Sequence, residues 1–100
     1  VKMYTSKFAN KDVDFLYETI LLLKTKEECY RFFEDLCTVK EILDMSQRLS
    51  VAIMLEEKKP YQEIVNKTKA STATISRVNK SLLYGAEGYH LVLKKMKDQP

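Results

Sequence analysis

The chain has 100 residues, a formal net charge of +3, 45% hydrophobic residues and 31% charged residues. This length and apolar content predict one compact domain over residues 1–100 and leave too little chain for a second domain. Only two glycines and two prolines occur, so we expect nearly continuous helix with short joints.

Membrane insertion and secretion are not expected from this sequence. No apolar run approaches the ~20 residues that span a bilayer. The opening segment VKMYTSKFAN lacks the apolar core of a secretion signal. We therefore expect a soluble, cytoplasmic protein without a membrane partner.

The apolar periodicity predicts an all-α fold of about six helices. In chain order they lie near residues 11–24, 26–37, 39–57, 61–67, 72–84 and 88–97. The first three carry apolar residues on broad faces, so each of these helices needs neighbours on more than one side. These apolar residues are Phe15, Leu16, Ile20, Leu21, Leu22, Leu23, Phe32, Phe33, Leu36, Ile42, Leu43, Met45, Leu49, Ile53 and Leu55. A second subunit could cover these faces, which makes 1–57 the predicted dimerisation helices; a ligand pocket is the competing use.

The two cysteines, Cys29 and Cys37, fall on an apolar helical stripe. Their spacing lacks the close pairing of a metal motif, so we predict no metal site and two buried free thiols. A redox switch is the alternative interpretation.

Residues 58–84 contain the most informative pattern, the segment YQEIVNKTKASTATISRVNK from Tyr61 to Lys80. It predicts two short helices joined by a tight turn, a helix-turn-helix, because five positions are apolar or small where two steeply crossing helices must touch. Those positions are Ile64, Val65, Ala70, Ile75 and Val78. The alternative is an ordinary pair of helices that pack together only to stabilise the fold.

The ends of both short helices carry local signals. Pro60 suits the first turn of the first helix, and Ser71 is a good N-cap for the second. Lys69 stands where the turn of such a motif normally has glycine. A non-glycine residue in the left-handed conformation costs about 1–2 kcal/mol.

Charge is segregated along the chain. Residues 1–57 hold 8 Lys/Arg and 11 Asp/Glu, whereas residues 58–100 hold 9 Lys/Arg and 3 Asp/Glu. The basic half is therefore the half with the helix-turn-helix, as phosphate binding requires.

The segment ATISRVNKSL, residues 73–82, resembles the recognition-helix segment of the Trp repressor family. The whole chain is similar to the YerC/YecD-type branch of that family. This resemblance implies a Trp repressor-like subunit of about six helices, an interlocked homodimer, and binding to double-stranded DNA through paired helix-turn-helix units. The remaining residues, 85–100, would form a C-terminal helix.

The resemblance also marks a possible effector pocket. Thr74, Arg77 and Ser81 match residues that border the tryptophan pocket of the family, and Gln47 or Arg48 falls where a second pocket arginine is expected. Val78, however, stands where the tryptophan-binding repressor has a glycine whose slot admits the indole ring. We therefore predict that tryptophan does not bind; the effector is unknown and no cofactor is expected.

Each residue type in the second short helix suggests a role on DNA. We expect base contacts from its amino-terminal end, where Arg77 can make a bidentate contact to guanine and small residues can approach a thymine methyl. The predicted base-contacting residues are Ser71, Thr72, Ala73, Ser76 and Arg77. The predicted phosphate-contacting residues are Lys58, Lys59, Lys67, Lys69 and Lys80, which add affinity but no sequence choice.

An enzyme is not expected, because the lone histidine, His90, has no identifiable nucleophile or metal partner in the sequence. We expect it to be a surface or packing residue. The main rival to a DNA-binding regulator is a dimeric protein-interaction module that keeps the helix-turn-helix as a scaffold.

Overall fold

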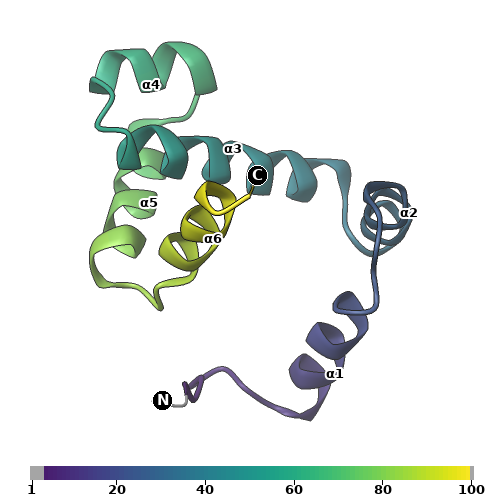
Figure 1. Cartoon of the computed structure of the whole chain (residues 1–100). Helices are drawn as coiled ribbons and strands as arrows, with labels where there is room; N and C mark the ends of the chain where they lie inside the picture. The colour runs from purple at the N-terminus through teal and green to yellow at the C-terminus, as the bar shows by residue number, and fades with distance from the viewer. Residues whose placement is uncertain (1–3, 100) are drawn as a thin grey trace. The chain divides into compact units, whose positions relative to one another are not determined.

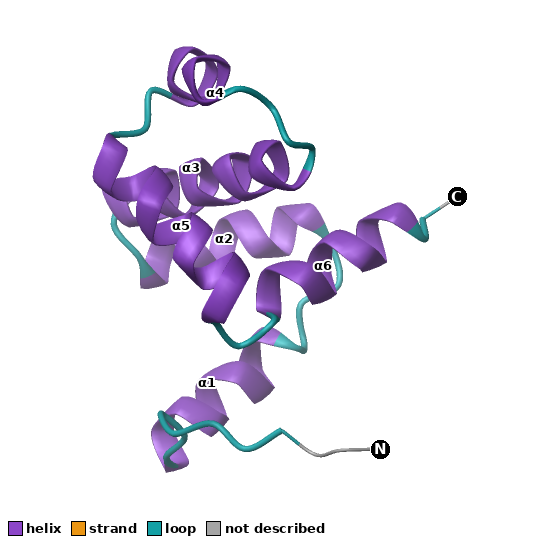
Figure 2. Ribbon diagram, turned by 90° about the vertical axis from the view of Figure 1, so that its left-hand side faces the viewer, coloured by secondary structure: helices purple, strands orange, loops and turns teal. Residues whose placement is uncertain are grey.

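The computed structural model describes residues 4–99, and within them the fold is all-α, with six helices and no strand (Figures 1 and 2). The helices are α1 (Lys11–Ile20), α2 (Lys26–Leu36), α3 (Val39–Glu56), α4 (Tyr61–Thr68), α5 (Thr72–Tyr84) and α6 (Gly88–Lys97). The predicted six-helix, all-α fold is confirmed, and the predicted bounds of the last two helices are those observed.

Helix α1 ends four residues earlier than the sequence suggested. After Ile20 the chain closes two tighter turns, in which the N–H of Leu22 bonds to the carbonyl of Thr19 and the N–H of Leu23 to that of Ile20, both at 3.0 Å. Such i to i+3 bonds often tighten the chain at a helix end. The leucines of residues 21–23 continue the apolar pattern, so no local sequence signal marks the end of α1.

The chain divides into two compact units, with the break between Thr38 and Val39. The first contains α1 and α2, and neither of these helices holds a buried residue. Their large apolar side chains that remain exposed to solvent, together with those in the turn after α1, are Phe15, Tyr17, Leu21, Leu22, Tyr30 and Leu36. The apolar faces predicted for these helices are thus present but uncovered in a single chain.

The second unit is built around α3, which contacts α4, α5 and α6, while α5 also contacts α6 (Figure 1). Its core consists of Val51, Ala52, Ile64, Ala70, Ile75 and Val78. Four of the five apolar positions predicted for the helix-turn-helix are buried, and the fifth, Val65, packs against this core half-buried. Helix α3, which the sequence grouped with the dimerisation helices, therefore packs with the helix-turn-helix.

The cysteines differ from expectation. Both thiols are free, as predicted, but Cys29 is exposed and Cys37 is half-buried in the single chain. The prediction of two buried thiols is wrong here; Cys29 is exposed because it belongs to α2, which holds no buried residue.

The single histidine joins two helices. Half-buried His90 in α6 donates a hydrogen bond from Nε2 to the backbone carbonyl of Leu82 in α5, at 2.7 Å. This bond satisfies one of the carbonyls near the C-terminal end of α5, which have no partner within the helix. Packing is therefore its observed role.

The part of the chain that the structure describes contains neither a membrane-spanning helix nor a cluster of metal-binding side chains. None of the helices there is long and apolar enough to cross a bilayer. Nor do residues 4–99 bring together three or more His, Cys, Asp or Glu side chains that could hold a metal ion.

Candidate nucleic-acid interface

Two lysines in the left-handed conformation, Lys58 before α4 and Lys69 after it, flank this helix. Lys58 has φ 59° and ends α3, with its N–H bonded to the carbonyl of Leu55 and the N–H of Lys59 bonded to that of Met54. These two bonds form a Schellman motif, which usually has glycine at the left-handed position. Lys69 has φ 61° and ψ 17° and ends α4, as the sequence predicted for the turn.

Lys69→Gly should stabilise the protein. Glycine removes the steric cost of the left-handed conformation, which is about 1–2 kcal/mol. Part of this gain is lost because glycine increases the conformational entropy of the unfolded chain, so we expect a net increase of about 0.5–1 kcal/mol in the free energy of unfolding. Urea unfolding measures it. The matched control is Lys67→Gly, which places glycine within α4 and should cost about 1 kcal/mol. Equal effects of the two substitutions would contradict the strain at Lys69.

The amino-terminal ends of the two short helices are capped differently. Ser71 is the N-cap of α5, and its hydroxyl accepts a hydrogen bond from the N–H of Thr74 at 3.1 Å, as predicted. Pro60 lies one position before the first turn of α4 rather than within it. Its carbonyl accepts from the N–H of Ile64 at 3.2 Å, so the proline still fixes the start of the helix.

The turn of the helix-turn-helix is tied to α3 by Gln47. The Gln47 side-chain Nε2 donates to the carbonyl of Thr68 at 2.9 Å, across 21 residues of sequence. The Thr68 hydroxyl in turn accepts from the N–H of Ala70 at 3.1 Å. Gln47 is thus occupied in holding the turn, a role that no local sequence pattern signals.

A second hydrogen bond joins the two short helices directly. The phenol of Tyr61, the first residue of α4, donates to the hydroxyl of Thr72, the first residue of α5, at 2.9 Å. Sequence reasoning missed this contact. The only available signal was that steeply crossing helices bring positions at their ends close together.

The predicted DNA-contacting residues lie on α4, α5 and the segments next to them. Lys58 and Lys59 precede α4, Lys67 and Lys69 lie at its end, and Lys80 lies in α5. The remaining five occupy the N-cap and first two turns of α5. All ten side chains are exposed, namely Ser71, Thr72, Ala73, Ser76, Arg77, Lys58, Lys59, Lys67, Lys69 and Lys80.

The six residues of the possible effector pocket are in different environments. Val78 is 1% exposed and belongs to the core, so its side chain fills the space that a glycine would leave open. Thr74, Gln47 and Arg48 are half-buried, while Arg77 and Ser81 are exposed. An open, mostly apolar hollow of about 590 Å³ lies nearby, lined by Leu49, Ser81, Gly85, Ala86, Gly88, Tyr89 and Val92. Among these lining residues only Ser81 belongs to the predicted pocket.

The helix pair has a left-handed turn at Lys69, an N-cap at Ser71 and a buried apolar core. Comparison with known families leads to the same type of protein. The family model described as Trp repressor protein matches residues 11–97. The chain belongs to the Trp repressor family. Membership of this family implies a helix-turn-helix DNA-binding regulator rather than an enzyme.

Relatives of this chain extend the match over nearly its whole length. It is 50% identical over 96 residues to YerC, an uncharacterised protein of Bacillus subtilis strain 168, covering 96% of this chain and 92% of YerC. A proposed Trp repressor from Staphylococcus aureus, whose crystal structure is known, has a sequence 45% identical to this chain. Its structure matches with a TM-score of 0.89, and 98% of each chain is covered. A TrpR-like protein from Eubacterium eligens ATCC 27750 is 52% identical, with a TM-score of 0.88, covering 91% of this chain and 94% of that one. The resemblance read from residues 73–82 is thereby confirmed.

Proposed function

We propose that this protein is a cytoplasmic, homodimeric, sequence-specific DNA-binding regulator of transcription, of the repressor type, and not an enzyme. The observation that carries this proposal is the helix-turn-helix of a Trp repressor family member, with a capped second helix whose five predicted base-contacting side chains are solvent-exposed. In helix-turn-helix proteins, the Trp repressor among them, the amino-terminal end of the second helix enters the major groove.

Base recognition is assigned to the first two turns of α5. Arg77 is the side chain with the fork of donors that fits guanine O6 and N7, and Ser71, Thr72, Ala73 and Ser76 are small enough to let the helix approach the base edges closely. The core position of Ile75 supports this assignment, because Ile75 and these exposed residues share one helix and its burial leaves them on the outer side.

Phosphate contacts are assigned to Lys58, Lys59, Lys67, Lys69 and Lys80. Lysines at the left-handed positions 58 and 69 support this role, because glycine would relieve their steric cost but would remove a positive charge from the segment that contains the helix-turn-helix. The Lys69→Gly variant should therefore bind DNA more weakly while unfolding at higher urea concentration than the native protein.

A second copy of this chain is the proposed occupant of the uncovered apolar faces of α1 and α2. Neither helix buries a residue in the single chain, although Phe15 and Tyr30 are large aromatic side chains, and Leu22 in the turn between the helices is exposed as well. Large apolar side chains exposed in such number on two helices are typical of a surface that another protein covers. A dimer would also present two reading helices about 34 Å apart, the spacing that successive major grooves on one face of the duplex require. The family resemblance adds that the two chains would interlock.

Selection from a random pool of duplex DNA tests the proposal. The purified full chain is incubated with the pool at two salt concentrations, and the DNA retained at the higher one is sequenced, with the dimer checked by light scattering. Enrichment of a two-fold symmetric site, with affinity that falls steeply as salt rises, is the expected result. A folded dimer that enriches no sequence would contradict it and would favour the protein-interaction module.

Tryptophan should leave DNA binding unchanged. The core position of Val78 leaves no slot for an indole ring between α5 and its neighbours, and Gln47 is engaged with the turn. Titrating the selected site with and without saturating tryptophan should give the same dissociation constant within error. A tenfold gain in affinity on adding tryptophan would refute this prediction.

A further inference from the structure

Hydrogen bonds stiffen the turn between α4 and α5. The Thr68 hydroxyl donates to the carbonyl of Ile64 at 2.7 Å and accepts from the N–H of Ala70 at 3.1 Å. The N–H of Lys69 also bonds back into α4, at 2.9 Å. Ser71, the N-cap of α5, follows directly in the chain. A displacement of the Thr68 carbonyl is therefore passed on to the start of α5.

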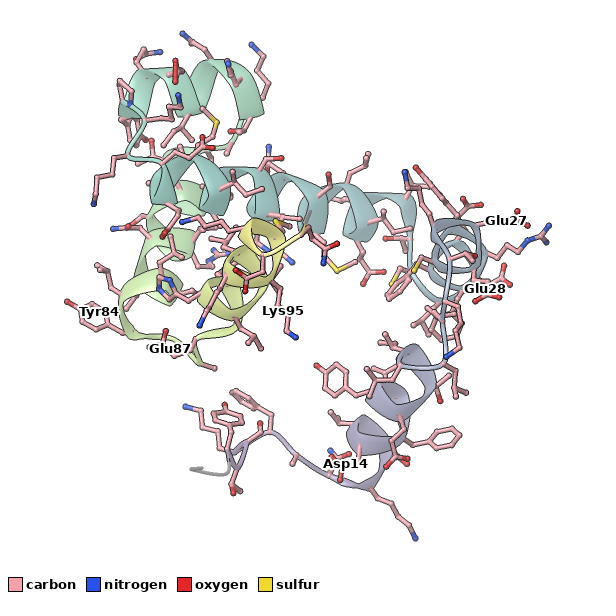
Figure 3. All side chains as sticks on the ribbon, in the orientation of Figure 1. Asp14, Glu27, Glu28, Tyr84, Glu87 and Lys95 are labelled. Atoms are coloured by element: carbon pink, nitrogen blue, oxygen red, sulfur yellow. The ribbon has the colours of Figure 1, made fainter. Side chains whose placement is uncertain are left out.

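Helix α5 is held near both of its ends. Close to its carboxyl end, which Tyr84 marks in Figure 3, His90 of α6 donates to the carbonyl of Leu82. At its amino end, the Gln47 side chain of α3 holds the turn through the Thr68 carbonyl, at 2.9 Å. Apolar packing between helices is compatible with crossing angles that differ by about 15–20°. The two attachments therefore define the angle of α5 more narrowly than burial of its apolar face alone.

Helix α3 connects this arrangement to the proposed dimer. Its two buried residues lie in its carboxyl half, beyond Gln47. Its amino half leaves Val39, Leu43 and Met45 exposed, as α1 and α2 leave theirs, so it can take part in the contact with a second copy. In a dimer joined through this half of α3, the angle between α3 and α5 sets the separation of the two reading helices.

We propose that Gln47 is a positioning residue for DNA binding: its bond to the Thr68 carbonyl fixes the angle of the reading helix and thereby selects the spacing between the two half-sites. This inference rests on the proposed function. Moving one half-site by one base pair displaces it by about 3.4 Å and turns it by roughly 35° around the duplex. To follow it, at least one subunit must change the angle of α5 and break the bond. A variant that lacks the bond does not have this cost.

The test measures the spacing preference of full-length variants. Gln47→Met keeps the length and helix propensity of the side chain but has no donor. Gln47→Glu keeps its shape but can only accept when ionised, so its carboxylate repels the Thr68 carbonyl. The matched control is Gln62→Met, because Gln62 is an exposed glutamine of α4 whose amide bonds to Asn66 of the same helix, at 3.1 Å. Light scattering and thermal unfolding confirm that each variant is a folded dimer.

Each protein is titrated at neutral pH with three duplexes: the selected site, and the same site with one base pair inserted or removed between its half-sites. The spacing preference is the ratio of the dissociation constants for the altered and the selected spacing. The native protein and Gln62→Met should give the same ratio. Gln47→Met should lower this ratio by about 3- to 10-fold, the effect of one neutral hydrogen bond. Gln47→Glu should lower it at least as much.

An unchanged ratio for Gln47→Met would overturn the inference. This holds whether its affinity for the three duplexes stays at the native level or falls by one common factor, because a bond that only stabilises the fold affects every spacing equally. Failure of the proposed function is distinguishable from this result, since the native protein would then enrich no site from which to build the duplexes.

Discussion

Replacing Arg77 with alanine should remove most of the protein's preference for its specific site. A bidentate contact between arginine and guanine contributes about 1–3 kcal/mol. The proposed homodimer loses it in both half-sites, so the expected loss is about 2–6 kcal/mol, or roughly 30- to 10⁴-fold in specific affinity. The fold should be unaffected, because the Arg77 side chain is exposed and surface substitutions usually change stability by less than about 0.5 kcal/mol.

The matched control for this prediction is Arg77→Lys. Lysine keeps the positive charge but has no planar fork of donors, so it cannot make the bidentate contact. It should retain binding to nonspecific DNA with the native salt dependence and still lose much of the specific affinity. Fluorescence titration against the selected site and a scrambled site measures both. If Arg77→Ala weakened binding to both sites equally, Arg77 would be a phosphate contact instead.

Replacing Ile64 with alanine should destabilise the second unit by about 2–5 kcal/mol, the usual cost of truncating a buried isoleucine. Ile64 is 1% exposed and belongs to the core cluster that includes Val51, Ile75 and Val78. The substitution leaves a cavity beneath the helix-turn-helix, so specific DNA binding should also fall. This loss is a large fraction of the total stability of a typical domain, which is about 5–15 kcal/mol.

Urea unfolding followed by circular dichroism measures this loss, with all variants at one protein concentration because the stability of the proposed dimer would depend on concentration. Leu83→Ala is the control, since Leu83 lies in α5 but is 62% exposed. It should change the free energy of unfolding by less than about 1 kcal/mol. A loss below 1 kcal/mol for Ile64→Ala would mean that α4 is not anchored through this side chain.

The features that the sequence determined are local in the chain. The bounds of α5, the N-cap at Ser71 and the left-handed turn residue Lys69 each depend on a few neighbouring residues whose side chains bond or clash with the nearby backbone. The buried positions Ile64 and Val78 also followed from the sequence, because helical spacing decides which side chains share a face. The family resemblance, carried by residues 73–82, added the identity of the fold.

The tertiary structure decided the features that depend on how helices cross. Gln47 meets Thr68 across 21 residues, and Tyr61 meets Thr72 across 11, because α3, α4 and α5 bring these side chains within hydrogen-bond distance. Local patterns do not encode such distances, since a small change in crossing angle moves a helix end by several ångströms. The exposure of Cys29 has a similar cause: an apolar stripe says that a side chain can be buried, but only a neighbouring surface buries it.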